Sequence, residues 1–297
     1  FGGINVIFAG DFFQYPPIAG TPLYAPISKS TKISNLEIKK RLGRLAWKTI
    51  NIVVSLEEQQ RMKDDTGYAE AVRRLRVRKC NLEDLDLFNS RLIKSASYPQ
   101  GIDMKMSENQ QACAIISTNL LRETINIRKA KSNCAMDPSK KLVVCAALDK
   151  ITPTPSESDT EIYMDLLKLD VSRFSSEGAL PGFISLYEGM PVILRNRNLS
   201  TELGITNGAQ GTLRQINCEV GFSQLTSATS VIVEFPRSRV HLPHLPEHYF
   251  PITAITWHFS TTLTNSSGNQ DKYRVVRQQL PIQPAFAVTG QSAQGKT

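Results

Sequence analysis

The feature that most constrains the fold is the segment at residues 4–9, which reads INVIFA and is followed by Gly10-Asp11. A short run that is apolar on both faces is typical of a buried strand in a parallel sheet, because helices cover both faces of such a sheet. Pro16-Pro17 then keeps the following loop out of a helix. The chain is therefore expected to contain an α/β layer fold.

The rest of the first 185 residues continues this alternation. Helices are expected where apolar residues recur at helical spacing, and strands where short apolar runs occur between turn signals. Asn81 is the expected N-cap of the third helix, whose side chains Leu82, Leu85, Phe88 and Leu92 are expected to form a buried stripe. The expected helices are 35–48, 66–79, 81–93 and 119–131, and the expected strands are 50–56 and 113–117.

The pattern changes after about residue 185 to short, β-branched runs separated by turns. These runs predict a small antiparallel barrel or sheet inserted into the α/β unit. The expected strands are 191–196, 211–216, 230–235 and 252–259, followed by a polar loop at 260–272 and a buried strand at 284–289. The segment 152–160 is expected to be a mobile loop.

Charge and cysteine content narrow the class of protein. The formal net charge of +8 favours a polyanionic partner, because basic side chains displace counterions condensed on nucleic acid. The five cysteines are scattered without a C-x-x-C pair, which is typical of reduced thiols inside a cell. No apolar run approaches the ~20 residues of a membrane-spanning helix, and no leader pattern precedes the first strand.

The loop after the first strand, residues 10–17, reads G-D-F-F-Q-Y-P-P. Ligands of open α/β sheets bind at the carboxyl ends of strands, so this loop lies at the expected active edge. Asp11 and Gln14 could there organise a metal-bound water and sense a terminal phosphate. The alternative is a capping Asp11 beside a surface Gln14.

The same residues resemble motif III of superfamily-one helicases, usually G-D-x-x-Q-L-P-P, with Tyr15 in place of leucine. Gln60-Arg61 resembles motif IV, and the resemblance implies that Arg61 reaches the γ-phosphate; the alternative is a surface salt-bridge arginine. The planar, always charged guanidinium suits this role because it can stabilise charge on the transferring phosphoryl group. Leu75, Arg76 and the helix start at Leu82 match the PIF/RecD-like branch in particular.

Two later segments also match this family. Residues 188–194 read E-G-M-P-V-I-L and residues 206–212 read T-N-G-A-Q-G-T. In PIF-like proteins this pair opens a small Src-homology-three-like barrel inserted in the second RecA-like domain. The resemblance implies four segments: the end of a first RecA-like domain at 1–80, the first part of a second at 81–185, the barrel at 186–274, and the return strand at 275–297.

The last eight residues, 290–297, read G-Q-S-A-Q-G-K-T and satisfy the G-x-x-x-x-G-K-[ST] pattern of a P-loop. In this superfamily, however, the P-loop precedes motif III in the chain. In family order, residues 285–297 instead resemble motif V, which implies that Thr289, Gln294, Gly295 and Thr297 line the strand-binding channel and couple it to nucleotide. A P-loop nucleotide-binding protein using Lys296 stays an alternative.

The resemblance implies part of an ATP-dependent DNA helicase that translocates 5′ to 3′ on single strands and unwinds duplex junctions. It implies ATP and Mg²⁺ as cofactors, with the P-loop, the Mg²⁺ ligands and the motif VI arginine expected outside this chain, which would then be inactive alone. We expect a monomer in the nucleus, or alternatively the mitochondrion, with roles in DNA repair, recombination or telomere maintenance. The rival hypothesis is a non-catalytic helicase remnant that at most binds nucleic acid. The basic run at 73–79 fits a solvated helix face and a track for phosphates equally well.

Overall fold

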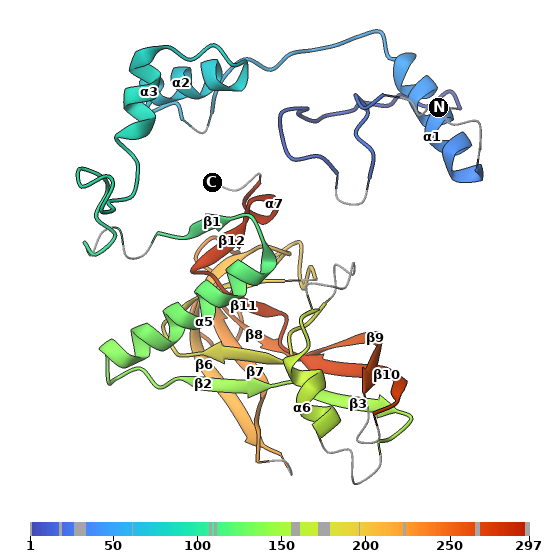
Figure 1. The fold of residues 1–297 in the computed structure, drawn as a ribbon, viewed down its shortest axis with the longest axis vertical. Helices are drawn as coiled ribbons and strands as arrows, with labels where there is room; N and C mark the ends of the chain where they lie inside the picture. Colours follow the sequence, from blue (N-terminus) through green and yellow to red (C-terminus); the bar gives the residue numbers. More distant parts are fainter. Residues whose placement is uncertain are drawn as a thin grey trace. The chain divides into compact units, whose positions relative to one another are not determined.

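A computed structural model describes residues 2–17, 20–26, 34–60, 62–106, 109, 112–155, 161–171, 179–195, 197–221, 224–264 and 268–294. The chain divides into two compact units (Figure 1). Unit 1 comprises residues 1–110 and 294–297, and unit 2 comprises residues 111–293. The division into four segments at residues 80, 185 and 274 stays a prediction.

Unit 1 contains three described helices, α1 Asn35–Lys48, α2 Thr66–Arg76 and α3 Leu82–Asn89. All three were predicted, although α2 and α3 end three or four residues early. The predicted N-cap of α3 is confirmed: Asn81 accepts from the backbone N–H of Asp84, whose carboxylate accepts in return from the backbone N–H of Asn81. This reciprocal cap satisfies two of the donors that a helix start leaves free.

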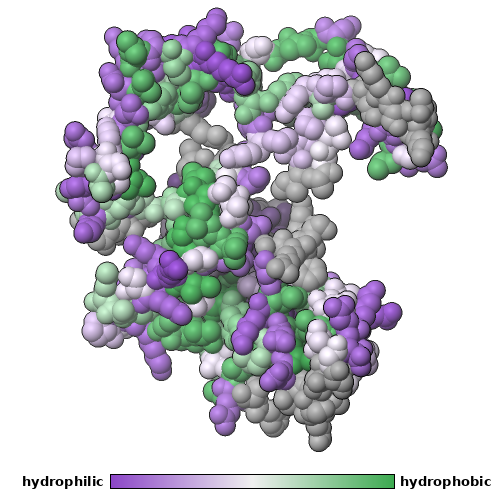
Figure 2. Space-filling view, viewed as in Figure 1, coloured by the Kyte–Doolittle hydropathy of each residue, from purple (hydrophilic) through white to green (hydrophobic). Residues whose placement is uncertain are grey.

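The two strands predicted in unit 1 are wrong. Residues 4–9 and 50–56 form no strand, and Ile7 and Leu56 are 94% and 95% exposed. Figure 2 shows the second of these segments as a hydrophobic stretch at the top of the view. The physical reason is that a strand needs neighbours for its backbone N–H and C=O groups, and the described part of unit 1 offers none.

The predicted buried stripe of α3 is also wrong for most of its members. Leu82, Leu85 and Leu92 are exposed, and Phe88 alone is half-buried, with its ring edge-on to Tyr68 at 6.1 Å. An amphipathic helix buries its apolar face only against another layer. No sheet is available to cover this face among the described residues of unit 1.

Unit 2 contains the α/β element that the sequence predicts. Strand β1 Ala114–Ile116 pairs in parallel with β12 Ala287–Thr289, and α5 Asn119–Met136 follows β1. On α5, the buried Asn126 side chain accepts from the backbone N–H of Ala287 at 2.8 Å and donates to its carbonyl at 3.2 Å. The predicted strand and helix are confirmed, and α5 extends five residues further than predicted.

The largest sheet of unit 2 has five antiparallel strands in the order β11-β5-β6-β7-β8 (Figure 1). It contains three of the four predicted short strands, as β5, β6 and β7, and β6 and β7 are longer than predicted and carry register shifts. The strand predicted at 252–259 is instead divided between β8 of this sheet and β9 Ile255–Thr264 of a second sheet. Its inward side chains form the main hydrophobic core together with residues of α5, β2 and β4. The strands are β5 Pro191–Leu194, β6 Gln210–Val220, β7 Thr226–Glu234, β8 Tyr249–Thr253 and β11 Ile282–Pro284.

The polar loop predicted at 260–272 is wrong, because most of this stretch belongs to two strands of a second sheet. There β9 Ile255–Thr264 and β10 Gln270–Gln279 pair in antiparallel, and β3 Leu148–Thr152 pairs with the other edge of β10. The stretch reads as a loop because its strands alternate polar side chains on the solvent face. Helix α6 Glu161–Lys168 packs Ile162 and Leu166 against this sheet.

Two smaller details complete unit 2. The predicted strand at 284–289 is interrupted, because β11 ends at Pro284 and β12 begins at Ala287. The strands β2 Val143–Ala146 and β4 Phe183–Leu186 form an antiparallel pair. The predicted loop at 152–160 falls partly outside the described residues. No helix among the described ranges is long and apolar enough to cross a membrane.

Candidate functional site

The loop at residues 10–17 forms a turn that Asp11 organises. The backbone N–H of Gln14 donates to the Asp11 carbonyl at 3.1 Å, and the backbone N–H of Phe13 donates to its carboxylate at 2.9 Å. The same carboxylate forms an ion pair with Arg76, the last residue of α2. The Arg76 guanidinium also lies over the Phe13 ring, 4.5 Å from its centre. Asp11 therefore holds the loop rather than capping a helix.

Gln14 contacts Gln294, which belongs to the same unit. The Gln294 amide Nε2 donates to Gln14 Oε1 at 2.7 Å, and the backbone N–H of Tyr15 donates to Gln294 Oε1 at 3.2 Å. One side chain thus holds two neighbouring positions of the loop. Of the predicted site residues, these contacts bring together Asp11, Gln14 and Gln294.

Of the other predicted site residues, the structure describes only Thr289. Arg61, Gly295 and Thr297 lie outside the described residues, as does Lys296. Thr289 is buried at the end of β12, and its hydroxyl donates to the Ser292 hydroxyl at 3.0 Å. Because β12 is parallel to β1, Thr289 lies at a carboxyl edge of the sheet, where ligands of open α/β sheets bind.

The geometry after β12 separates the two interpretations of the last eight residues. A P-loop wraps a phosphate with an irregular Gly-rich loop before its helix begins at the G-K step. Here the helical turn α7 Gly290–Ala293 begins directly after β12. Residues 290–293 are therefore not available as a phosphate-wrapping loop, and the geometry favours the motif V interpretation.

The basic run at 73–79 is largely engaged in ion pairs. Arg73 pairs with Glu70 at 3.1 Å, and Arg74 pairs with the buried Asp84 carboxylate at 2.6 and 2.8 Å. These hydrogen bonds raise the pKa of Arg74 and lower the pKa of Asp84. Because Arg76 is bound to Asp11, the part of this run that could contact backbone phosphates is reduced to the exposed Arg78 and Lys79.

The pairing of Arg76 with Asp11 was missed from the sequence. The two residues are 65 positions apart, and charge patterning detects only pairs on one element. The pairing of Arg74 with Asp84 spans a helix end and was missed for the same reason. The sequence places both arginines in a basic run, and Arg76 also among the residues that resemble the PIF/RecD-like branch, but neither pattern indicates an ion pair.

The described residues do not fit a whole nucleotide. The Asp11 carboxylate is occupied by Arg76 and by the Phe13 N–H. The turn α7 has four residues and offers no extended phosphate cradle. Among the described ranges no group of three or more His, Cys, Asp or Glu side chains could hold a metal ion. What this part of the chain supplies is a loop that carries Gln14 and is held by the contacts of Asp11 and Gln294.

Comparison with known structures identifies the fold. No family model matches the sequence. The Pif1 helicase from Candida albicans is 18% identical, over 97% of this chain and 55% of that chain, with a TM-score of 0.53. Bacteroides Pif1 bound to ssDNA is 16% identical, over 100% of this chain and 55% of that chain, with a TM-score of 0.56. Bacteroides Pif1 in complex with ADP-AlF3 and ssDNA is 17% identical, with the same coverage and a TM-score of 0.58.

The chain has the fold of a Pif1 helicase. The resemblance to PIF-type helicases predicted from the motifs is therefore confirmed. A curated relative, the ATP-dependent DNA helicase PIF5 of Trypanosoma brucei brucei, is 22% identical in an alignment that covers 82% of this chain and 32% of that protein. The chain thus spans about a third of PIF5 and about half of the Pif1 chains. The roles of the individual site residues stay predictions.

Proposed function

We propose that this chain is part of an ATP-dependent DNA helicase of the Pif1 type, which couples ATP hydrolysis to movement along a single strand and to duplex unwinding. One observation carries the proposal. A chain with the Pif1 fold presents the G-D-x-x-Q loop and the motif V segment in the family's order, and Gln294 of that segment is hydrogen-bonded to Gln14 of that loop.

Single-stranded DNA is the partner that we propose. The solved Bacteroides relatives are described as bound to ssDNA, and the formal net charge of +8 suits a polyanion. The finer features are part of the same proposal: movement from 5′ to 3′, action at duplex junctions, a monomeric state, a nuclear location, and roles in repair, recombination or telomere maintenance. We also propose that the five-stranded sheet corresponds to the inserted Src-homology-three-like barrel.

ATP and Mg²⁺ are the proposed cofactors, and the relative with ADP-AlF3 supports the first of them. Gln14 would sense the terminal phosphate, and Arg61 would stabilise charge on the transferring group. Thr289, Gln294, Gly295 and Thr297 would carry the change of nucleotide state to the strand-binding surface. In this assignment Asp11 acts through the loop, because its carboxylate is held by Arg76.

A measurement of DNA-stimulated ATP hydrolysis by the full-length protein tests this function. Gln14→Ala is expected to lower kcat by about tenfold or more, because it removes a group aimed at the transferring phosphate. Its affinity for a single strand should stay unchanged. Gln278→Ala, an exposed glutamine on β10, is the matched control and should behave like the parent.

Two outcomes would contradict the proposal in different ways. Hydrolysis at the parental rate in Gln14→Ala would remove Gln14 from the nucleotide site. Absence of any DNA-stimulated hydrolysis in the parent, with DNA binding retained, would favour the non-catalytic remnant.

A further inference from the structure

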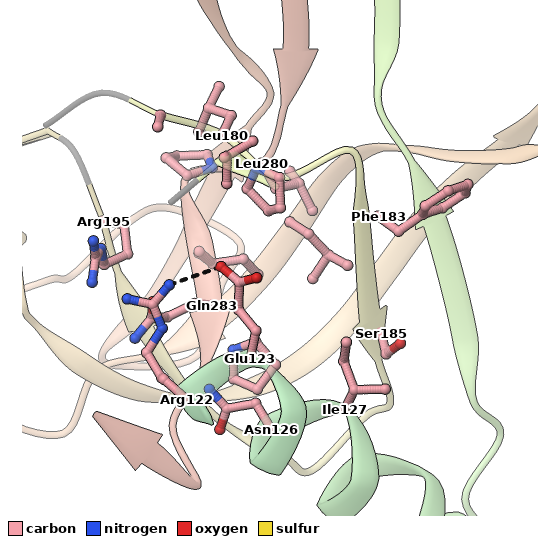
Figure 3. A pocket seen from close by; sticks show the side chains of 17 residues that line it. Arg122, Glu123, Asn126, Ile127, Leu180, Phe183, Ser185, Arg195, Leu280 and Gln283 are labelled. Atoms are coloured by element: carbon pink, nitrogen blue, oxygen red, sulfur yellow. Dashed lines mark hydrogen bonds and ion pairs between the residues drawn. The ribbon is translucent and has the colours of Figure 1, made fainter. Parts of the chain in front are cut away.

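A pocket in unit 2 is separate from every predicted site residue. It has a volume of about 100 Å³ and lies between α5, the strands β4, β5 and β11, and the segment 179–181. Most of its wall is apolar, and Figure 3 shows Leu180 and Leu280 on one side of it and α5 on the other. The apolar lining residues include Leu180, Pro181, Phe183, Ile184, Leu280 and Ile282. This volume exceeds what one buried water molecule needs.

The polar part of the wall begins with an ion pair on α5. The Arg122 guanidinium donates to the Glu123 carboxylate at 3.0 Å and to the Asn119 side chain at 2.7 Å. Arg122 is buried, and burial raises the pKa of Glu123. Arg122 is therefore already supplied with acceptors by its own helix.

Arg195, directly after β5, adds a second guanidinium that has no ion pair or side-chain hydrogen bond among the described residues. Burial, and then the charge of Arg122, lower the pKa of Arg195 to about 10, although Glu123 acts in the opposite direction. Arg195 still carries its charge at neutral pH. Figure 3 shows its guanidinium near that of Arg122, on the side away from Glu123. The wall therefore carries two guanidinium groups and one carboxylate. The Asp170 carboxylate lies outside the wall but close enough to raise the pKa of Glu123 further.

Gln283 on β11 provides an independent sign that an acceptor is needed. Its amide Nε2 is buried without a hydrogen-bond partner, and it is the one such side-chain atom found among the described residues. A buried donor that lacks an acceptor is costly, so such atoms are rare in folded proteins. Asn126, which also lines the pocket, does not supply this acceptor, and both ends of its amide are bound to Ala287.

We propose that this pocket binds a small oxyanion on an apolar body, either a carboxylate or a phosphate monoester. Its oxygens accept hydrogen bonds from Arg195 and from the Gln283 amide, and its apolar part packs against the leucine, proline and phenylalanine side chains of the wall. The charge is complementary, because the wall itself carries two guanidinium groups and one carboxylate. The binding requires neither ATP nor DNA, so the site is independent of the proposed helicase function.

Binding to the intact 297-residue chain, measured by calorimetry and by the shift in Tm, tests the site. The probes are benzoate, phenyl phosphate and inorganic phosphate. We expect saturable binding of benzoate or phenyl phosphate with a rise in Tm, and weaker binding of inorganic phosphate, which lacks the apolar body. Inorganic phosphate binding as tightly as phenyl phosphate would overturn the apolar part of the assignment.

Two variants and one control locate the site. Arg195→Met and Gln283→Leu should each weaken binding by about tenfold or more, because each removes a donor to an anion. Gln283→Leu also removes the unpartnered donor, so it should fold at least as well as the parent and keeps the test decisive if Arg195→Met folds poorly. Arg197→Met, at an exposed arginine outside the wall, should change the affinity by less than about twofold. Absence of binding by both organic anions, or an affinity in both pocket variants equal to that of the parent, would overturn the proposal.

Discussion

The buried ion pair between Arg277 and Asp149 gives the sharpest stability prediction for unit 2. Arg277 on β10 is fully buried, and its guanidinium donates to both Asp149 carboxylate oxygens, at 2.8 and 2.7 Å. It also donates to the carbonyls of Leu166 at 2.7 Å and Leu180 at 3.2 Å, and it lies over the Phe259 ring. One side chain therefore joins β10 to β3, to α6 and to the segment before β4.

Asp149→Asn removes the countercharge and keeps the shape. Breaking a buried pair by removing one partner costs about 3–5 kcal/mol, because the other charge stays buried without compensation. Asparagine retains one acceptor for Arg277, so we expect a loss near the lower end, about 3 kcal/mol. That is a large part of the ~5–15 kcal/mol by which a typical domain is stable.

The double variant Asp149→Leu with Arg277→Met separates the lost charge from the lost contacts. It removes both charges but leaves the Leu166 and Leu180 carbonyls without their donor, at a cost of about 1–3 kcal/mol each. The single variants Asp149→Leu and Arg277→Met each leave one charge buried without its partner, whereas the double variant leaves none. We therefore expect the double variant to lose less stability than the sum of these two single variants, as coupled neighbours do.

Urea unfolding followed by Trp257 fluorescence measures these losses within unit 2. Trp257 is buried and stacked on Phe259 at 4.1 Å, beside Arg277. Trp47, the other tryptophan of the chain, belongs to unit 1 and is replaced by phenylalanine in the parent and in every variant. A loss below about 1 kcal/mol in Asp149→Asn, or strict additivity in the double variant, would refute the reasoning.

Two further predictions concern other buried groups of unit 2. Asn126→Ala should destabilise unit 2 by about 2 kcal/mol or more in the same urea assay, because it leaves the Ala287 N–H and C=O without partners. An unchanged midpoint of urea unfolding would contradict a stabilising role of these two hydrogen bonds. The pKa of Cys145 is raised to about 12 by burial and by its neighbour Cys218, so its thiolate fraction stays negligible at pH 8. Iodoacetamide should therefore label the exposed Cys80 and Cys113 of the native protein while leaving Cys145 unlabelled; mass spectrometry reads this out, and equal labelling rates would contradict the burial.

The sequence predicts elements well where the information is local. The helices of unit 1 begin within one residue of the predicted positions, and the predicted N-cap Asn81 forms a capping box with Asp84. The strand β1 and helix α5 were predicted from one apolar run and its neighbour. Capping and hydrophobic periodicity act within a few residues, so one segment is enough to reveal them.

Prediction failed where structure depends on partners. Residues 4–9 have the composition of a buried strand, yet no described strand pairs with them, so Ile7 is almost fully exposed. The opposite error occurred at 260–272, where the polar face of the β9–β10 hairpin conceals two strands. Pairing is a property of two segments, and neither pattern contains its partner.

The candidate site shows the same division. Gln14 and Gln294 were each predicted from a motif, but their hydrogen bond joins positions 280 residues apart and could not be predicted. The ion pair of Asp11 with Arg76 and the unpartnered amide of Gln283 are likewise products of tertiary packing. The motifs predicted the chemistry of the site, whereas the side chains that hold it needed the structure.

The most direct test of the central claim is a measurement of ATP-dependent strand separation by the full-length protein. The substrates are two fluorescently labelled duplexes of equal length, one with a 5′ single-stranded tail and one with a 3′ tail. We expect unwinding of the 5′-tailed duplex that needs ATP and is lost in Gln14→Ala. Unwinding of the 3′-tailed duplex alone would contradict the proposed direction, and failure to separate either duplex would contradict the assignment as a helicase.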